Sequence, residues 1–160
     1  MDQNRNLILV VCTGNTCRSP MAAKLLEHAL TAEKAPLNQF TVESAGVSAA
    51  TGESASDNSV AALKKVNIDL SQHKSQPVTQ ELIDRAFVIL GMTDSHLDTL
   101  KFYNQQNLPE HIYLFREFVE PGRSEIPDPF GQNFDAYQAC LDSMIEAIPS
   151  LIAFLDKVSK

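Results

Sequence analysis

A cysteine and an arginine, Cys12 and Arg18, lie six positions apart in a short segment, residues 12–20, that reads Cys-Thr-Gly-Asn-Thr-Cys-Arg-Ser-Pro. A cysteine thiolate is a strong nucleophile, and the planar guanidinium of an arginine can bind two oxygens of a tetrahedral oxyanion at once. Gly14, together with a left-handed Asn15, allows the chain to curl so that successive N–H groups point toward one centre. The segment therefore predicts a nucleophile inside a cradle for a phosphate-like group.

The elements on either side of this segment are those that must position it. The apolar run 7–11 precedes it and predicts a buried strand. Ser19 is expected to cap a helix whose first position is Pro20. A loop between a parallel strand and a helix N-terminus presents free N–H groups in a positive potential, which also favours a thiolate at Cys12. The alternative is that Cys12 simply ends a core strand and Arg18 lies in a solvated turn. That alternative does not explain why a buried strand, a flexible Gly-Asn pair and a helix start occur together around these two residues.

Strands and helices are expected to alternate along the rest of the chain. Apolar or β-branched runs predict strands at 40–44, 85–90 and 112–115, and helical periodicity predicts helices over 57–66, 79–84, 94–103 and from 134 onward. Pro149 is expected to kink or restart the last helix. This alternation is typical of a mostly parallel sheet in an α/β domain, and we expect residues 1–160 to form one domain.

Composition excludes several classes of protein. The chain has 160 residues, 44% hydrophobic and 21% charged, and a formal net charge of −7, so a nucleic-acid partner or an anionic membrane surface is not expected. No uninterrupted apolar run approaches the roughly 20 residues of a membrane span. The polar stretch 1–6 lacks a signal-peptide pattern, and three cysteines fit no disulfide framework. We therefore expect a cytoplasmic protein.

A second candidate for chemistry is Asp128, in the long loop 120–133. Pro127 and Pro129 stiffen the backbone on both sides of this carboxylate. A long loop in a compact domain tends to carry function, so Asp128 is the candidate proton donor to a leaving group. The alternative is an ordinary turn carboxylate, since Pro-Asp-Pro is also good turn chemistry.

These residues carry a family resemblance. The run Val11–Ala22 resembles the signature of the low molecular weight protein tyrosine phosphatases, Glu43–Gly46 resembles the segment after that family's second strand, and Asp128-Pro129-Phe130 resembles its general-acid loop. The resemblance covers nearly the whole chain. It implies a three-layer, flavodoxin-like α/β/α fold with a four-stranded parallel sheet in the order 2-1-3-4. It also implies hydrolysis of phosphorylated protein side chains through a thiophosphoryl-cysteine intermediate.

The resemblance also assigns roles to individual residues. It implies that Asn15 is held by Ser44 and His73, and that Cys12 and Cys17 form a reversible disulfide under oxidant. From its position, Ser19 can hydrogen-bond the Cys12 sulfur as well as cap the helix; the alternative is that it only caps the helix. The expected catalytic residues are Cys12, Arg18 and Asp128. The expected phosphate- or substrate-binding residues are Thr13, Gly14, Asn15, Thr16, Cys17, Arg18, Ser19 and Phe130.

Other polar or reactive residues receive no role in catalysis. Cys140 lies in the apolar pattern of the last helix and is expected in the core, and no function is assigned to His28, His96 or His111. The spacing Cys-x4-Cys lacks further ligands nearby, so we expect no metal site and no cofactor.

Two features bear on the substrate. The fifth loop residue is Thr16, where tyrosine phosphatases of the family carry an aliphatic residue, and Phe130 is followed by Gly131 rather than a second aromatic. Both features resemble the bacterial protein-arginine phosphatase branch. A hydroxyl at Thr16 and the Asp128 carboxylate can accept hydrogen bonds from a guanidinium. Phosphoarginine is therefore the expected substrate, and phosphotyrosine is the alternative.

Two further classes of protein are alternatives to a phosphatase. A thioredoxin-coupled arsenate reductase shares the Cys-x5-Arg loop but needs two more cysteines in mid-chain, and the chain has none between Cys17 and Cys140. A module that only binds phosphoproteins would need neither the nucleophile Cys12 nor the acid Asp128. The expected partners are thus phosphorylated proteins. No pattern indicates an oligomeric state.

Overall fold

The computed structural model describes residues 4–160; residues 1–3, part of the polar N-terminal stretch discussed above, lie outside the described residues. Strands and helices alternate along most of the chain. The strands are β1 Leu7–Cys12, β2 Thr41–Gly46, β3 Ala86–Gly91 and β4 His111–Leu114. The helices are α1 Arg18–Thr31, α2 Asp57–Lys64, α3 Gln80–Arg85, α4 Asp94–Tyr103 and α5 Phe134–Val158, with a short 3-10 turn at Leu37–Gln39.

The four strands form one parallel sheet in the order β2-β1-β3-β4, as the resemblance implied. β1 is central, with β2 and β3 on its two sides, and all six of its residues are buried. The register pairs Cys12 with Gly46 and Val11 with Gly91. In a parallel sheet the carboxyl ends of all strands meet at one edge, so the loops that follow β1, β2 and β3 converge there.

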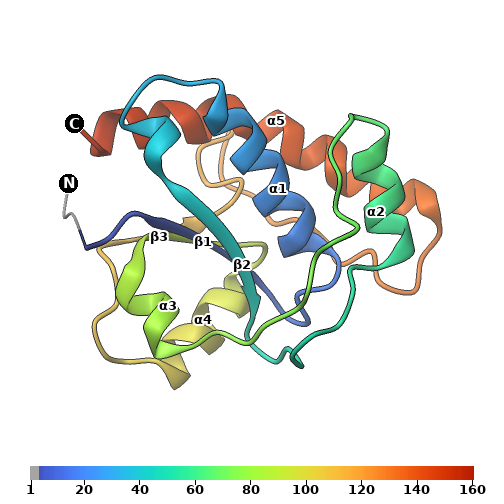
Figure 1. Cartoon of the computed structure of the whole chain (residues 1–160), viewed down its shortest axis with the longest axis horizontal. Coiled ribbons are helices and arrows are strands. Elements are labelled where there is room, and N and C mark those ends of the chain that lie inside the picture. Colours follow the sequence, from blue (N-terminus) through green and yellow to red (C-terminus); the bar gives the residue numbers. More distant parts are fainter. Residues whose placement is uncertain (1–3) are drawn as a thin grey trace.

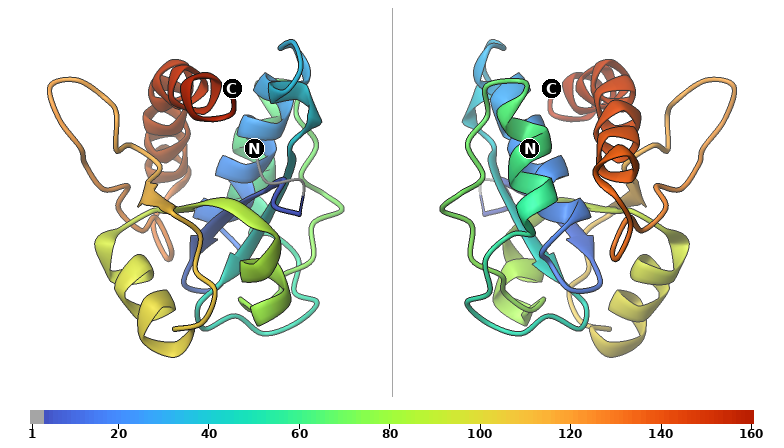
Figure 2. Two further views of the ribbon diagram at one scale, coloured as in Figure 1. Left: turned by 90° about the vertical axis from the view of Figure 1, so that its left-hand side faces the viewer. Right: turned by 90° about the vertical axis from the view of Figure 1, so that its right-hand side faces the viewer.

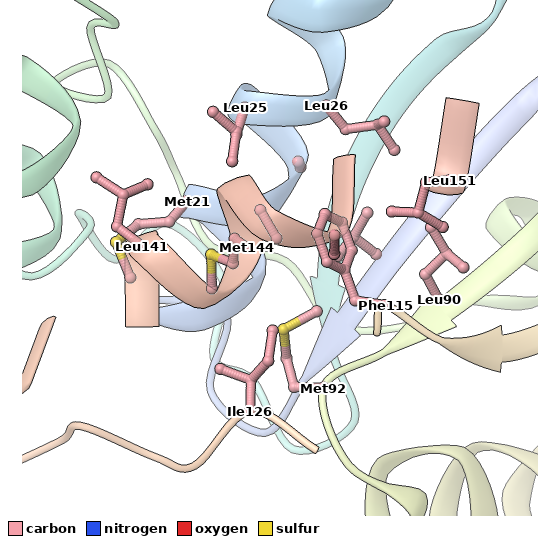
Figure 3. Packing of buried hydrophobic residues seen from close by; sticks show 14 of the residues in the cluster. Met21, Leu25, Leu26, Leu90, Met92, Phe115, Ile126, Leu141, Met144 and Leu151 are labelled. Atoms are coloured by element: carbon pink, nitrogen blue, oxygen red, sulfur yellow. The ribbon is translucent and has the colours of Figure 1, made fainter. Parts of the chain in front are cut away.

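Helices cover both faces of the sheet, giving three layers (Figures 1 and 2). Alternate side chains of β1 point to opposite faces: Ile8, Val10 and Cys12 join the core beneath α1, α2 and α5, whereas the residues between them join the core beneath α3 and α4. The larger of these cores reaches the candidate site. Met92 and Ile126 lie side by side at its lower end, beneath Met144 of α5 (Figure 3).

The last helix, α5, runs through Pro149 without interruption over 25 residues, so the predicted restart at Pro149 is wrong. Ile145, an apolar residue of this helix, is 40% exposed and lies outside its buried stripe. Among residues 4–160, α5 is the one helix long and apolar enough to cross a membrane by length and composition. Its mean hydropathy is high although polar residues such as Asp142 and Glu146 interrupt the apolar residues. The apolar stripe of α5 packs against α1 and α2 in the larger core, through Tyr137, Leu141, Met144, Leu151 and Leu155.

The start of α1 differs from the prediction. The helix begins at Arg18, and its N-cap residue is Cys17, whose side chain makes no capping hydrogen bond. Ser19 is therefore the second residue of the helix and not its cap. Its hydroxyl lies 2.9 Å from both the Cys12 sulfur and the Asn15 amide nitrogen, so it faces inward into the loop instead of capping the helix.

Candidate active site

The segment between β1 and α1 forms a loop around a small pocket, which we call the phosphate loop (residues 12–18). The pocket has a volume of about 230 Å³ and is lined by Cys12, Thr13, Gly14, Asn15, Thr16, Cys17, Arg18, Asp128 and Phe130. Every one of these nine residues was a site candidate from sequence. A larger hollow of about 390 Å³ lies behind the loop, beside Ser44 and His73, but neither a cysteine nor an arginine lines it.

The backbone of the phosphate loop is held from outside. The carbonyl of Thr13 accepts from the Ser48 N–H at 3.0 Å, and the carbonyl of Thr16 accepts from the Ser56 N–H at 2.9 Å. In a planar trans peptide the N–H points opposite to the C=O. Because these carbonyls point outward, the N–H groups of the residues after them point toward the pocket. Together with the first turn of α1, this arrangement favours an anion at the centre of the loop.

Asn15 is the residue on which the curl of the loop depends. It is fully buried and has the left-handed conformation, with φ 58°. Its side-chain amide donates to Ser19 Oγ and Ser44 Oγ, both at 2.9 Å, and its Oδ1 accepts from the Gln76 N–H at 3.0 Å. Short polar side chains that bond locally are the ones that tolerate this conformation.

His73 holds the same residue from the other side. Its Nε2 lies 2.7 Å from the Asn15 carbonyl oxygen, which can only accept, so Nε2 carries the proton. Burial lowers the pKa of His73, and the nearby Lys24 and Lys74 act in the same direction against the favourable bond to Asn15. The structure thus brings the buried Asn15 and Ser44 and the partly buried His73 together in one cluster.

Gly46, at the end of β2, allows the loop to approach the sheet. A Cβ at this position would collide with the Thr13 carbonyl oxygen and lie 3.0 Å from the Asn15 nitrogen. Backbone atoms cannot move aside as a flexible side chain can. A side chain at residue 46 is therefore incompatible with the observed loop.

Cys12 and Arg18 are both buried, with 3% and 5% exposure. The Cys12 sulfur lies 2.9 Å from Ser19 Oγ. The Arg18 guanidinium donates through one nitrogen to the carbonyl of Ile126 at 2.8 Å, and its other terminal nitrogen lies 3.8 Å from Asp128 Oδ2. Arg18 therefore links the phosphate loop to the loop that carries Asp128.

The Asp128 side chain is about half exposed at the mouth of the pocket, and its Oδ1 accepts from the Phe130 N–H at 3.0 Å. Phe130 itself is 74% exposed. The backbone just before Asp128 is anchored at two further points. The Ile126 N–H donates to the Met92 carbonyl at 3.0 Å, and Cys140 Sγ donates to the Pro127 carbonyl at 3.2 Å.

Three residues near the site make contacts that the sequence did not predict. For one of them, Cys140, the sequence predicted only a place in the core. Cys140 is buried as expected, and burial raises its thiol pKa to about 11, but it also supports the Asp128 loop. The hydroxyl of Tyr137 lies 3.5 Å from Cys17 Sγ, and burial raises the Tyr137 pKa to about 12. His96 contacts the phosphate loop directly, with Nε2 3.1 Å from Thr13 Oγ1. The sequence does contain one indication for His96. It lies at the start of a helix that follows a buried strand, and such helix starts lie at the carboxyl edge of the sheet, where the phosphate loop also lies.

No cluster of three potential metal ligands occurs among residues 4–160, and the cysteines Cys12, Cys17 and Cys140 are free thiols.

The pocket offers a thiol nucleophile, a guanidinium, inward N–H groups and a carboxylate. This set can bind a tetrahedral dianion, attack its central atom and protonate what leaves.

Comparison with known proteins gives a consistent result. Residues 7–160 match the family described as low molecular weight phosphotyrosine protein phosphatase. The protein-arginine-phosphatase of Geobacillus stearothermophilus is 39% identical over 147 residues, covering 90% of this chain and 92% of that protein. A probable low molecular weight protein-tyrosine-phosphatase, EpsP of Ralstonia nicotianae, is 30% identical and covers 91% and 92%.

A solved structure described as the YwlE arginine phosphatase, a cysteine-to-serine mutant with a phosphorylated active-site serine, is 32% identical and superposes with a TM-score of 0.83. The match covers 95% of this chain and 97% of that one.

Proposed function

The chain belongs to the low molecular weight phosphotyrosine protein phosphatase family, and from that premise we propose that it hydrolyses phosphoarginine side chains of proteins, with Cys12 as the nucleophile. Its relatives are hydrolases of phosphorylated proteins, and the chain is a cysteine-dependent protein phosphatase with a phosphoenzyme intermediate. The observation that carries the assignment of Cys12 is its position: a buried thiol at the carboxyl end of the central strand, at the base of the phosphate loop.

In the first step the Cys12 thiolate attacks phosphorus, an S–P bond forms and the bond from phosphorus to the leaving group breaks. The loop N–H groups and Arg18 hold the three equatorial oxygens, where charge must be stabilised. In the second step water attacks the phosphocysteine, and the sulfur leaves with the electron pair of the S–P bond. The Ser19 hydroxyl, 2.9 Å from this sulfur, can donate to it as it departs.

Asp128 is the proposed general acid of the first step and the base that activates water in the second. Its half-exposed carboxylate lines the pocket, on the side toward which a leaving group would point outward. We expect Asp128→Asn to lower kcat/KM, which reports only the first step, by about 100-fold or more for an alkyl phosphate, since general acid catalysis contributes about 10²–10⁴-fold. The effect should be smaller for p-nitrophenyl phosphate, whose leaving group needs less protonation. Equal losses on both substrates would contradict the assignment.

The proposal for phosphoarginine is supported by the polar wall of the pocket. Thr16 and Asp128 both line it, and each carries an oxygen that can accept from the guanidinium behind the phosphoryl group. A relative from Geobacillus stearothermophilus that is 39% identical to this chain is named a protein-arginine-phosphatase, which also supports the proposal. The segment from residue 110 onward holds nine acidic and four basic residues, a balance that favours a cationic leaving group.

The test compares kcat/KM on peptides that carry phosphoarginine and phosphotyrosine. We expect the wild-type enzyme to prefer phosphoarginine and Thr16→Ile to shift this preference toward phosphotyrosine by about tenfold or more, the size of one good hydrogen bond or apolar contact. Thr51→Ile, which changes an exposed threonine that does not line the pocket, is the matched control. A wild-type preference for phosphotyrosine that Thr16→Ile leaves unchanged would reject the proposal.

Phosphotyrosine is the second candidate substrate because of Phe130. This exposed ring lies at the mouth of the pocket and can pack against a phenyl group. An aromatic face also attracts a guanidinium, so Phe130 alone does not discriminate between the two substrates. The kinetic comparison above decides between them.

We also propose that Cys17 protects Cys12 from oxidation. Peroxide converts the Cys12 thiolate to a sulfenic acid, and attack by the Cys17 thiol then forms a disulfide and releases water. Both thiols are buried and line the same loop. Wild-type enzyme inactivated by peroxide should recover with dithiothreitol, whereas Cys17→Ser should not. Because catalysis needs Cys12 reduced, we place the protein in a reducing compartment, the cytoplasm.

A further inference from the structure

His96, the third residue of α4, is a buried histidine beside the phosphate loop. It is 4% exposed. β3 lies next to β1 in the sheet, so the N-terminus of the helix that follows β3 faces the loop that follows β1. This placement brings His96 within contact distance of Thr13 and Arg18, residues 83 and 78 positions away in the sequence.

The hydrogen bonds of the ring fix its tautomer. Nδ1 lies 3.2 Å from the backbone nitrogen of Thr93, which can only donate, so Nδ1 is the acceptor. In a neutral ring the proton is therefore on Nε2. Nε2 lies 3.1 Å from Thr13 Oγ1 and donates to it.

The contact with Arg18 is of a different kind. The second terminal nitrogen of Arg18 lies 3.3 Å from the same Nε2. Both atoms carry protons in this tautomer, so this is a close contact between the ring edge and the guanidinium and not a hydrogen bond. The first terminal nitrogen is fixed by the Ile126 carbonyl at 2.8 Å. The guanidinium thus lies between the Ile126 carbonyl, which it hydrogen-bonds, and the His96 ring, which occupies the space toward α4.

The ring has to be neutral for this arrangement. A proton on Nδ1 would point at the Thr93 N–H, and a positive ring would repel Arg18. Burial, and then Arg18, lower the pKa of His96 to about 4, while Asp128 acts in the opposite direction.

We propose that His96 is a positioning residue of the phosphatase, which holds Thr13 of the phosphate loop and the guanidinium of Arg18 in the geometry that receives the phosphoryl group. This inference rests on the proposed role of Arg18 but not on which phosphorylated side chain is the substrate. His96 does not contact the reacting atoms. It acts through its two neighbours, so its loss weakens the binding of any tetrahedral oxyanion.

Two substitutions separate this role from the capping of α4. His96→Gln keeps an acceptor for the Thr93 N–H and a donor long enough to reach Thr13. His96→Asn keeps the acceptor, and with it the helix cap, but is too short for Thr13 and leaves space beside Arg18. His111→Asn, which removes a mostly buried ring in β4 among Phe87, Tyr113 and Phe154, is the matched control.

The readouts are the inhibition constant of inorganic phosphate, kcat/KM on p-nitrophenyl phosphate, and Tm. We expect His96→Asn to raise the inhibition constant and lower kcat/KM, each by tenfold or more, with a Tm no lower than that of His111→Asn. His96→Gln should stay within threefold of wild type in both kinetic readouts. Thr13→Val removes the hydroxyl that accepts from His96 and leaves the ring in place, so it should raise the inhibition constant severalfold. If His96→Asn does not fold, Thr13→Val tests the proposal in its place.

The proposal is overturned if His96→Asn and Thr13→Val both keep the inhibition constant within twofold of wild type, or if His96→Gln is as impaired as His96→Asn. Failure of the proposed function looks different. In that case Cys12→Ser would hydrolyse p-nitrophenyl phosphate as fast as wild type, or phosphotyrosine would be the better substrate, and neither result depends on His96.

Discussion

Replacing Asn15 by alanine should destabilise the whole protein as well as the site. The substitution removes three buried side-chain hydrogen bonds, to Ser19, Ser44 and the backbone of Gln76. At about 0.5–1.5 kcal/mol for each bond, this loss is about 1.5–4.5 kcal/mol. Alanine in the left-handed conformation adds about 1 kcal/mol. The expected loss of about 2.5–5.5 kcal/mol is a large part of the roughly 5–15 kcal/mol typical of a whole domain.

The assay is urea denaturation followed by far-UV circular dichroism, on wild type, Asn15→Ala and Asn15→Gly. Glycine adopts the left-handed conformation freely, so Asn15→Gly should recover about 1 kcal/mol relative to alanine while still lacking the three bonds. Asn67 is a matched control because it has nearly the same backbone, φ 63°, on an exposed turn. Asn67→Ala should cost only the conformational part, about 1 kcal/mol.

The reasoning is refuted if Asn15→Ala lowers the free energy of unfolding no more than Asn67→Ala does. That result would mean that the bonds from Asn15 contribute nothing net, and that the curl of the loop is held by the backbone contacts alone. Catalysis gives a second check. Asn15→Ala that remains folded should lose at least tenfold in kcat/KM, because the N–H groups of the loop no longer converge.

Three other predictions follow from contacts around the site. Gly46→Ala should abolish most phosphatase activity, because the added Cβ meets loop backbone, whereas Gly122→Ala, which meets nothing within 4 Å, should keep activity within about twofold of wild type. Cys140→Ala should lower kcat/KM severalfold for alkyl phosphates and hardly at all for p-nitrophenyl phosphate, since the lost bond to Pro127 supports the loop of the proposed acid; equal effects on kcat/KM for both substrates would argue for a general packing defect. The pKa of His96 is depressed to about 4 in the folded state, so its contribution to stability is complete above pH 6.5 and is lost as pH falls through 4, by up to about 3 kcal/mol. Urea midpoints measured from pH 7 to pH 4 should therefore fall more steeply for wild type than for His96→Gln, and parallel curves would contradict the depressed pKa.

Much of the fold could be predicted because local and tertiary preferences agree. The apolar runs at 7–11 and 85–90 became β1 and β3, which are buried on both faces, and the predicted helix 94–103 has the bounds of α4. The pocket also followed from sequence, because seven of its nine lining residues are consecutive in the chain. A loop of seven residues between a strand and a helix leaves few ways to arrange its groups.

The rest depends on contacts between distant segments. Ser19 has the residue type of an N-cap, but the buried polar atoms of Cys12 and Asn15 attract its hydroxyl more strongly than the helix end does. The approach of His96 to Arg18 requires the order of the strands, which no local pattern contains. The anchoring of the Asp128 loop by Arg18 and Cys140 likewise joins residues far apart in sequence or on different elements.

The placement of Cys12 on the central strand has a consequence for amide hydrogen exchange. β1 is paired on both sides and wholly buried, so its amides can exchange with solvent only when the protein unfolds globally. Asp128 lies in a largely exposed loop, residues 120–133, whose amides can exchange through local opening. The nucleophile and the proposed acid therefore belong to units with different opening free energies. A substitution in the loop can displace Asp128 while Cys12 and its cradle stay folded, so the proposed acid–base group can be altered without altering the proposed nucleophile.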